Sequence, residues 1–349
     1  MTAGESVAAQ AVETQTQKAA AKKQRAALLR TVGLFIFLVI VLAVLNRATH
    51  GNFLAPGNVL NVLRQIAVNA IIAVGQTLVI ITAGIDLSVG SLIALTGVLM
   101  AGTLASHPSV AVGLLLAVLV GLSAGGFAGF INGLPVVRFG LPPFITTLAM
   151  MLMARGLAFM YTNGQPIEID NHAFNSIGNG FMFPSLGHLI GIPGIPTQIL
   201  VMLAVVLVGG YVLTQTRFGR YVYAIGGNEE AARLSGINVF GVKLSVYIIA
   251  GALAGLSSLL LAGHLNSGSP QSGVGYELQS IAAVVVGGTS LMGGRGSISG
   301  TFIGALLIGM LYNLMNLLSI QSYAQEVVLG AVILIAVLLD QLRRQYLTT

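Results

Sequence analysis

Residues that could support catalytic or metal chemistry are few in this chain, and they do not form a catalytic pattern. The sequence contains no cysteine, so thiol chemistry and disulfides are excluded. Its five histidines are scattered, and no pair has metal-ligand spacing on one helix. Serines are plentiful, but no histidine and aspartate accompany them in a way that suggests a catalytic triad. We therefore predict no catalytic residue, no metal ligand and no cofactor in this chain.

Nucleotide binding is the other chemistry that glycine-rich loops can support. A P-loop needs a lysine directly after its glycines to reach the phosphates. The only lysines are at positions 18, 22, 23 and 243, and none follows a glycine. The segment Gly293–Gly296 is rich in glycine but contains only Arg295 as a cation. If ATP drives this protein, ATP must bind to another subunit.

The elements that position the functional residues are expected to be membrane-spanning helices. Hydrophobic residues make up 55% of the sequence and charged residues 7%, compared with about 25% charged residues in soluble domains. Apolar runs long enough to cross a bilayer recur along the chain. They cover about 31–47, 59–83, 88–106, 110–131, 142–162, 197–213, 242–264, 278–292, 297–318 and 324–342. We expect an all-α integral membrane protein, in which the short eighth run is tilted, broken or re-entrant.

The distribution of positive charge predicts the orientation. With a cytoplasmic N-terminus, 13 of the 16 lysines and arginines fall on the cytoplasmic side. Both termini are then cytoplasmic, and the formal charge of +6 reflects topology rather than nucleic-acid binding. Residues 1–30 are interpreted as a disordered cytosolic tail, and a signal peptide is the competing interpretation. Residues 31–344 would form the transmembrane domain.

Two turns at membrane depth resemble each other. The segments TAGIDLSVGSLIALTGVLMAG (Thr82–Gly102) and VGGTSLMGGRGSISGTFIGALLIG (Val286–Gly309) each end one span and begin the next. Such breaks are tolerated only where they are buried or line a cavity. Asp86, with its neighbour Ser88, caps the third span or contributes to a translocation path or gate. The other intramembrane polar candidates for this path are Asn69, Gln76, Thr146, Arg155, Asn313, Asn316 and Glu326.

Glycines at four-residue spacing form stripes on three spans. They are Gly121, Gly125, Gly129 and Gly133 on the fourth, Gly251 and Gly255 on the seventh, and Gly296, Gly300 and Gly304 at the ninth. Small residues at this spacing let helix backbones approach each other closely in membranes. The stripes predict close packing within one subunit, or alternatively a subunit interface.

The segment GGNEEAARLSGI (Gly226–Ile237) is a polar helix signal between hydrophobic spans. Asn228 suits the N-cap, Glu229 and Glu230 fall in the first turn, and Gly236 suits the left-handed position after the helix. Glu229 and Arg233 form a favourable pair four residues apart. A helix of about seven residues is not stable alone in water. We therefore expect a soluble partner to hold it within a cytoplasmic loop, 214–241.

The loop 163–196 is the largest element expected outside the membrane. It contains four prolines, several glycines and asparagines, and the acids Glu168 and Asp170. Loops of this length are usually functional or disordered. It is interpreted as a docking site for an external protein or as a passive cover over the outer mouth.

Four stretches, which include several of the motifs above, carry a family resemblance that runs from about Asn58 to Arg344. They are TLVIITAGIDLSVGS at 77–91, FITTLAMMLMARGLAFMYTNGQPI at 144–167, FGRYVYAIGGNEEAARLSGI at 218–237 and SGVGYELQSIAAVVVGGTSLMGGRGSISGT at 272–301. Together they resemble the permease subunits of bacterial ATP-binding-cassette importers, in the ribose-type monosaccharide branch. The wider permease pattern EAA-x3-G matches Glu230, Ala231, Ala232 and Gly236. The I-x-L-P tail that sometimes follows that pattern is missing.

The resemblance implies a permease of the bacterial cytoplasmic membrane that works with several partners. Two copies would flank one path, and an external sugar-binding protein would deliver a monosaccharide. A cytoplasmic ATPase, often with two fused nucleotide-binding halves, would grip the helix around Asn228–Gly236. Glu229, Glu230 and Arg233 would supply polar contacts, and Ala231 and Leu234 would pack into the ATPase. The alternatives are an ion-coupled secondary transporter, which would use Asp86 or Glu326, and a membrane receptor or scaffold.

Overall fold

The computed structural model describes residues 43–106, 109–189 and 193–348, without the side chains of 186, 188, 189, 339, 340 and 342–348. The expected tail 1–30 and most of the first expected span, 31–47, lie outside these residues. The chain divides into two compact units, residues 1–58 and 59–349, which are described separately.

The described part of the first unit is a short helix, 43–48, followed by turns. Thr49 is buried, and its hydroxyl oxygen accepts a hydrogen bond from the backbone N–H of Phe53 at 3.0 Å. The side-chain amide of Asn58 donates to the carbonyl oxygen of Phe53 at 2.9 Å. These bonds satisfy the backbone of the turn that leads into α2, which begins at Pro56.

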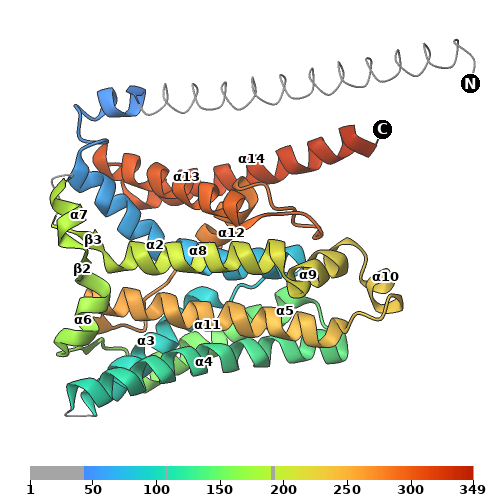
Figure 1. Cartoon of the computed structure of the whole chain (residues 1–349), viewed down its shortest axis with the longest axis horizontal. Coiled ribbons are helices and arrows are strands. Elements are labelled where there is room, and N and C mark those ends of the chain that lie inside the picture. Colours follow the sequence, from blue (N-terminus) through green and yellow to red (C-terminus); the bar gives the residue numbers. More distant parts are fainter. Residues whose placement is uncertain (1–42, 107–108, 190–192, 349) are drawn as a thin grey trace, which may run out of the picture. The chain divides into compact units, whose positions relative to one another are not determined.

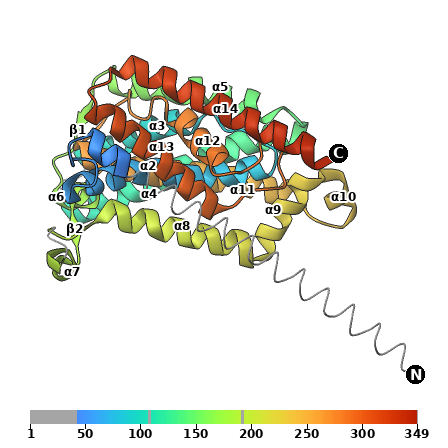
Figure 2. The same ribbon diagram turned by 90° about the horizontal axis from the view of Figure 1, so that it is seen from above.

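The second unit consists of helices joined by short connections (Figures 1 and 2). The long elements are α2 (Pro56–Ile81), α3 (Val89–Ala105), α4 (Val110–Phe139), α5 (Pro143–Thr162), α8 (Thr197–Gln215), α11 (Val239–Leu265), α13 (Ile298–Leu317) and α14 (Ser322–Thr348). The shorter helices are α6 (His172–Asn179), α7 (Pro184–Leu189), α9 (Arg217–Gly227), α10 (Glu229–Leu234) and α12 (Tyr276–Val286). The expectation of an all-α membrane protein is confirmed.

Among the described residues, six helices are long and apolar enough to cross a membrane. Three shorter apolar helices, Val89–Ala105, Tyr276–Val286 and Ser322–Leu338, accompany them. The expected span at 278–292 is the one that differs most, because α12 ends at Val286 and residues 287–297 form a non-helical connection. The clustered glycines of that connection take left-handed conformations at Gly288, Gly293 and Gly294, which a continuous helix cannot accommodate.

Helix α2 lies deepest in the protein: 89% of its most apolar 18-residue stretch is buried inside the chain, whereas only 22% of the corresponding stretch of α4 is buried. Helix α4 keeps many large apolar side chains exposed, such as Phe127 and Leu115. This is the pattern of a peripheral helix that faces lipid around a central helix that does not.

The glycine stripes of α4 and α11 meet each other within this one chain. A Cβ atom on Gly125 would lie 2.3 Å from the carbonyl oxygen of Gly251, and one on Gly251 would lie 2.1 Å from that of Gly125. A Cβ atom on Gly129 would lie 2.1 Å from the carbonyl oxygen of Tyr247. The prediction of close packing within one subunit is therefore confirmed for this pair of helices.

Two neighbouring glycines of α4 provide a matched test of this packing. We expect Gly125→Ala to destabilise the protein by about 1–3 kcal/mol, because its methyl group meets backbone that cannot rotate away. Gly126→Ala should stay close to wild type, since its nearest neighbour would be 3.8 Å away. Thermal unfolding of both purified variants in detergent measures the difference, and equal melting temperatures would contradict the packing described.

The segment 163–196 is folded rather than extended. It contains α6, α7 and the strands β1 (Ile167–Glu168), β2 (Phe181–Met182) and β3 (Ile195–Pro196). Strand β1 pairs antiparallel with β4 (Ser267–Gly268), and β2 pairs antiparallel with β3. In Figure 1 these elements lie at one end of the long helices, and α9 and α10 lie at the other end.

The two turns that resemble each other in sequence also meet in space. The backbone N–H of Gly294 donates to the carbonyl oxygen of Ile81 at 2.9 Å. One turn deeper, the hydroxyls of Thr77 on α2 and Thr301 on α13 hydrogen bond at 2.7 Å, and both residues are buried. The ends of α2 and α13 are thereby fixed to each other at the end of the molecule that carries α9 and α10 (Figure 1).

Candidate functional site

Helix α10 has the caps that its sequence predicts. The side-chain oxygen of Asn228 accepts a hydrogen bond from the backbone N–H of Ala231 at 2.9 Å. At the other end Gly236 takes a left-handed conformation with φ of 80°. Its N–H donates to the carbonyl oxygen of Arg233, and that of Ile237 donates to Ala232, which is the Schellman pattern. The helix therefore begins and ends where the sequence indicates.

Part of the support for this short helix comes from the chain itself, which the sequence does not reveal. Ala232 is only 4% exposed and packs in a cluster that includes Val136 and Val242. The carboxylate of Glu229 contacts Arg233 at 3.1 Å and Lys243 of α11 at 2.9 Å. Contacts within the chain therefore hold α10 in place, whereas the sequence predicts only a soluble partner for this role.

Burial raises the pKa of Glu229, but the hydrogen bonds and charges of Lys243 and Arg233 outweigh burial, so that the pKa lies below its ordinary value of 4.5. A carboxylate whose pKa is lowered by folding stabilises the folded state at pH values above its ordinary pKa. That contribution is lost as the pH falls through the lowered pKa. The ion pairs of α10 therefore remain intact at neutral pH.

The remaining residues of α10 face outward. Glu230 and Ala231 are exposed, the side chain of Arg233 is 62% exposed, and Leu234 is 80% exposed. Leu234 therefore lies exposed on a helix whose opposite side is anchored to this chain by Glu229 and Ala232. The exposed residues are all among those expected to contact the ATPase. Glu229 and Ala232 belong to the same helix but mainly hold it to this chain.

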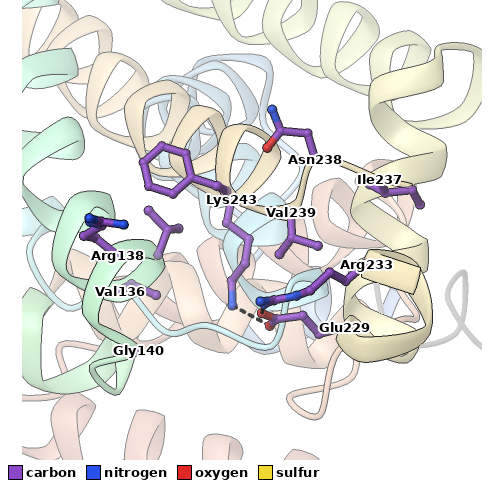
Figure 3. A pocket seen from close by; sticks show the side chains of 11 residues that line it. Val136, Arg138, Gly140, Glu229, Arg233, Ile237, Asn238, Val239 and Lys243 are labelled. Carbon is purple, nitrogen blue, oxygen red and sulfur yellow. Dashed lines mark hydrogen bonds and ion pairs between the residues drawn. The ribbon is translucent and has the colours of Figure 1, made fainter. Parts of the chain in front are cut away.

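A pocket of about 530 Å³ lies between α10, the end of α4 and the start of α11 (Figure 3). Arg138, Arg233 and Lys243 line it together with the single acid Glu229. Figure 3 shows the carboxylate of Glu229 between the cationic groups of Arg233 and Lys243. The pocket therefore carries an excess of positive charge beside the exposed face of α10.

Helix α9 connects α10 to the two turns at the ends of α2 and α13. The hydroxyl of Tyr223 donates to the carbonyl oxygen of Gly296 at 2.8 Å. A Cβ atom on Gly226 would lie 1.7 Å from the carbonyl oxygen of Ile81 and 2.5 Å from the nitrogen of Gly294. The backbones of 81–83, 226–227 and 293–294 thus touch directly. We name this contact the glycine junction.

Asp86 and Ser88 lie at the centre of a buried polar cluster. Oδ1 of Asp86 accepts hydrogen bonds from the backbone N–H of Ser88 at 2.8 Å and from its hydroxyl at 2.6 Å. Asn132 of α4 donates to the Ser88 hydroxyl at 2.8 Å, and Gln76 of α2 donates to the carbonyl oxygen of Asp86. Asp86 thus precedes the N-cap of α3, which is Ser88, and binds its backbone directly.

The other candidates for the path do not form one cluster. Arg155 donates from Nη1 to the carbonyl oxygens of Pro270 at 2.7 Å and Ser272 at 2.8 Å, so that it braces the connection after β4. Asn316 accepts from Gln325 of α14 at 2.9 Å. Asn69 and Asn313 are 7% and 8% exposed, on α2 and α13. The hydroxyl of Thr146 donates a hydrogen bond to the carbonyl oxygen of Pro143. Glu326 is exposed.

Several buried polar atoms have no hydrogen-bond partner among the described residues. They are Asn69 Oδ1, Gln76 Oε1, Asp86 Oδ2, Asn132 Oδ1, Asn175 Oδ1, Tyr247 Oη, Glu277 Oε2 and Thr289 Oγ1. Sequence reasoning missed Glu277 in the first turn of α12. It directly precedes the expected span 278–292, and an acid at the edge of a span is a signal that the sequence contains. Sequence reasoning also missed Asn132 and Tyr247, which only the fold brings to Asp86. No group of three potential metal ligands occurs in the described part of the chain.

Comparison with known proteins extends over most of the chain. Residues 58–337 match the family described as branched-chain amino acid transport system / permease component. The ribose import permease protein RbsC of Escherichia coli K12 is 47% identical over 305 residues, which are 87% of this chain and 92% of that protein. The RbsC of Bacillus subtilis is 47% identical over 312 residues, 89% of this chain and 91% of that protein.

A xylose transport system permease protein, XylH of Escherichia coli K12, is 36% identical over 362 aligned positions, which cover 88% of this chain and 91% of that protein. No solved structure matches the chain. The structure is consistent with these relatives. It has apolar helices around α2, as a membrane permease requires, and the capped helix α10 within a motif typical of permeases. The chain belongs to the branched-chain amino acid transport system / permease component family and is a multi-pass permease subunit of an ATP-binding-cassette importer in the bacterial cytoplasmic membrane.

Proposed function

We propose that this permease imports a monosaccharide, with ribose as the first candidate, in concert with a cytoplasmic ATP-binding subunit and an external sugar-binding protein. The exposed face of α10, formed by Glu230, Ala231 and Leu234, is the observation that carries the coupling role. The names of the relatives support the sugar. Two copies of the chain would enclose the path, and the ATP-binding subunit would provide two nucleotide-binding halves.

In this proposal ATP acts on the path through α10 and α9. The ATPase grips α10 differently in its ATP-bound and ATP-free states, which supplies the differential contact that a population shift requires. The glycine junction carries the movement from α9 to the ends of α2 and α13. Asp86 and Ser88, directly after α2, are the residues that this movement would rearrange to gate the path.

Sugar uptake by the complete transporter in proteoliposomes tests this function. We expect labelled ribose to accumulate only when ATP and Mg²⁺ are present on the ATPase side, because ATP is proposed to bind to the partner subunit. A proton or sodium gradient imposed without ATP should give no accumulation. Gradient-driven accumulation by this chain alone would contradict the proposal and favour an ion-coupled carrier that uses Asp86 or Glu326.

A further inference from the structure

A second pocket, of about 380 Å³, lies at the end of the molecule opposite α10. It is bounded by the start of α2, the start of α8, the end of α11 and the start of α12. The orientation expected from the charge distribution places this end outside the cell. The volume is within the range of small-molecule sites.

Side-chain amides dominate the polar lining of this pocket. Asn61 and Gln65 are exposed to it and form no hydrogen bond with the described residues. Gln198 is only 2% exposed, and its Nε2 donates to the carbonyl oxygen of Gly178 at 2.6 Å, a bond that does not use its amide oxygen. Tyr276 adds an aromatic ring and a hydroxyl. Amides both donate and accept, which suits hydroxyl groups that do the same.

The charges around the pocket disfavour a ligand that carries an ammonium group. None of the described residues that line it is a carboxylate, so that an ammonium group would find no charged partner. The guanidinium of Arg64 lies over the ring of Phe181 at 4.7 Å from its centroid. Nδ1 of His264 lies 2.8 Å from Oδ1 of Asn179. Each of the two basic side chains thus has one contact at the rim, and the positive charge of Arg64 is not paired with a carboxylate of the lining.

Two further amides of α2, Asn69 and Gln76, lie beyond the pocket in the buried interior of the chain. Asn61, Gln65, Asn69 and Gln76 fall within about 80° of one another around the helix, at about 100° per residue. Asn69 Oδ1 and Gln76 Oε1 are buried and have no partner among the described residues. The Nε2 of Gln76 reaches the carbonyl oxygen of Asp86 at the far turn.

We propose that the outer pocket is a low-affinity monosaccharide site, where Asn61, Gln65, Gln198 and Tyr276 receive the sugar before it enters the path between the two copies. This inference rests on the proposed import of a sugar. The site lies within one copy of the chain. Its ligand is a neutral polyhydroxylated ring, bound by hydrogen bonds to amides and by contact with the Tyr276 ring.

The test is direct binding of labelled ribose and labelled leucine to the purified full chain in detergent, by scintillation proximity. Ribose should bind to the wild type in the millimolar range and leucine should not. The double variant Asn61→Leu with Gln65→Met should weaken ribose binding about tenfold, since it removes two amides that form no hydrogen bond within the described chain. Gln271→Met is the matched control, because Gln271 is an exposed amide outside the pocket.

The same variants in the complete transporter separate this inference from the proposed function. The double variant should keep ATP hydrolysis stimulated by the sugar-binding protein but move several-fold less sugar for each ATP. Unchanged binding in the double variant, equal loss in Gln271→Met, or binding of leucine in place of ribose would overturn the outer site. A wild-type transporter that moves no sugar with ATP would instead overturn the proposed function, whatever the binding assay shows.

Discussion

The substitution Glu230→Lys is expected to abolish ATP-driven uptake while the chain stays folded and inserted. Glu230 is exposed and has no ion pair with any described residue, so that reversing its charge removes nothing that holds the fold together. It does place a cation on the face of α10 that is proposed to contact the ATPase. Uptake of labelled ribose and recovery of the ATP-binding subunit with the purified chain measure the effect together.

Two controls separate loss of contact from loss of the helix. Lysine near a helix N-terminus costs about 0.3–1 kcal/mol, so Glu230→Gln is included to remove the charge without adding a cation. Glu168→Lys reverses an exposed acid in β1, at the other end of the long helices, and should leave the recovery of the ATP-binding subunit unchanged. Normal uptake in Glu230→Lys would refute the role of α10 in coupling.

The substitution Gly226→Ala is expected to have the second largest effect. Its methyl group would lie 1.7 Å from the carbonyl oxygen of Ile81, and both partners are backbone, so the glycine junction must open to admit it. Overpacking of this kind costs about 1–3 kcal/mol and sometimes more. We expect a lower melting temperature in detergent and, in the complete transporter, ATP hydrolysis that no longer drives uptake.

The neighbouring substitution Gly227→Ala is the matched control for this prediction. A Cβ atom on Gly227 meets nothing within 4 Å, although the residue belongs to the same turn of α9. Its stability and uptake should equal those of the wild type. If Gly226→Ala behaves like Gly227→Ala in both assays, the junction neither packs as described nor transmits movement.

Local features of this fold were predictable from the sequence. The apolar runs place most helix ends within a few residues, because length and composition determine what can cross a bilayer. The caps of α10 were also predictable, since Asn228, Glu229, Arg233 and Gly236 act on neighbours within five residues. The Gly125 and Gly251 stripes showed which helix faces pack closely, but not that they pack against each other.

Features that depend on distant parts of the chain were not predictable. Lys243 is 14 residues from Glu229, and no local pattern links them, so the role of Glu229 as an anchor within the chain was missed. Ala232 was assigned to the ATPase contact with its neighbours, whereas it packs inward. The outer pocket was missed because Gln198 and Tyr276 reach Asn61 only through the arrangement of four helices.

The absence of cysteine from the sequence makes one measurement especially direct. Leu234→Cys places a single thiol on α10, at a position that is 80% exposed, and Val274→Cys places one in the connection between β4 and α12, at a position that is 67% exposed. Each variant is treated with a thiol-to-amine cross-linker in its native membrane, and the products are identified by mass spectrometry. We expect Leu234→Cys to cross-link to an ATP-binding subunit and Val274→Cys not to do so. Cross-linking of that subunit through Val274→Cys, or its failure to react through Leu234→Cys although it is bound, would contradict the account.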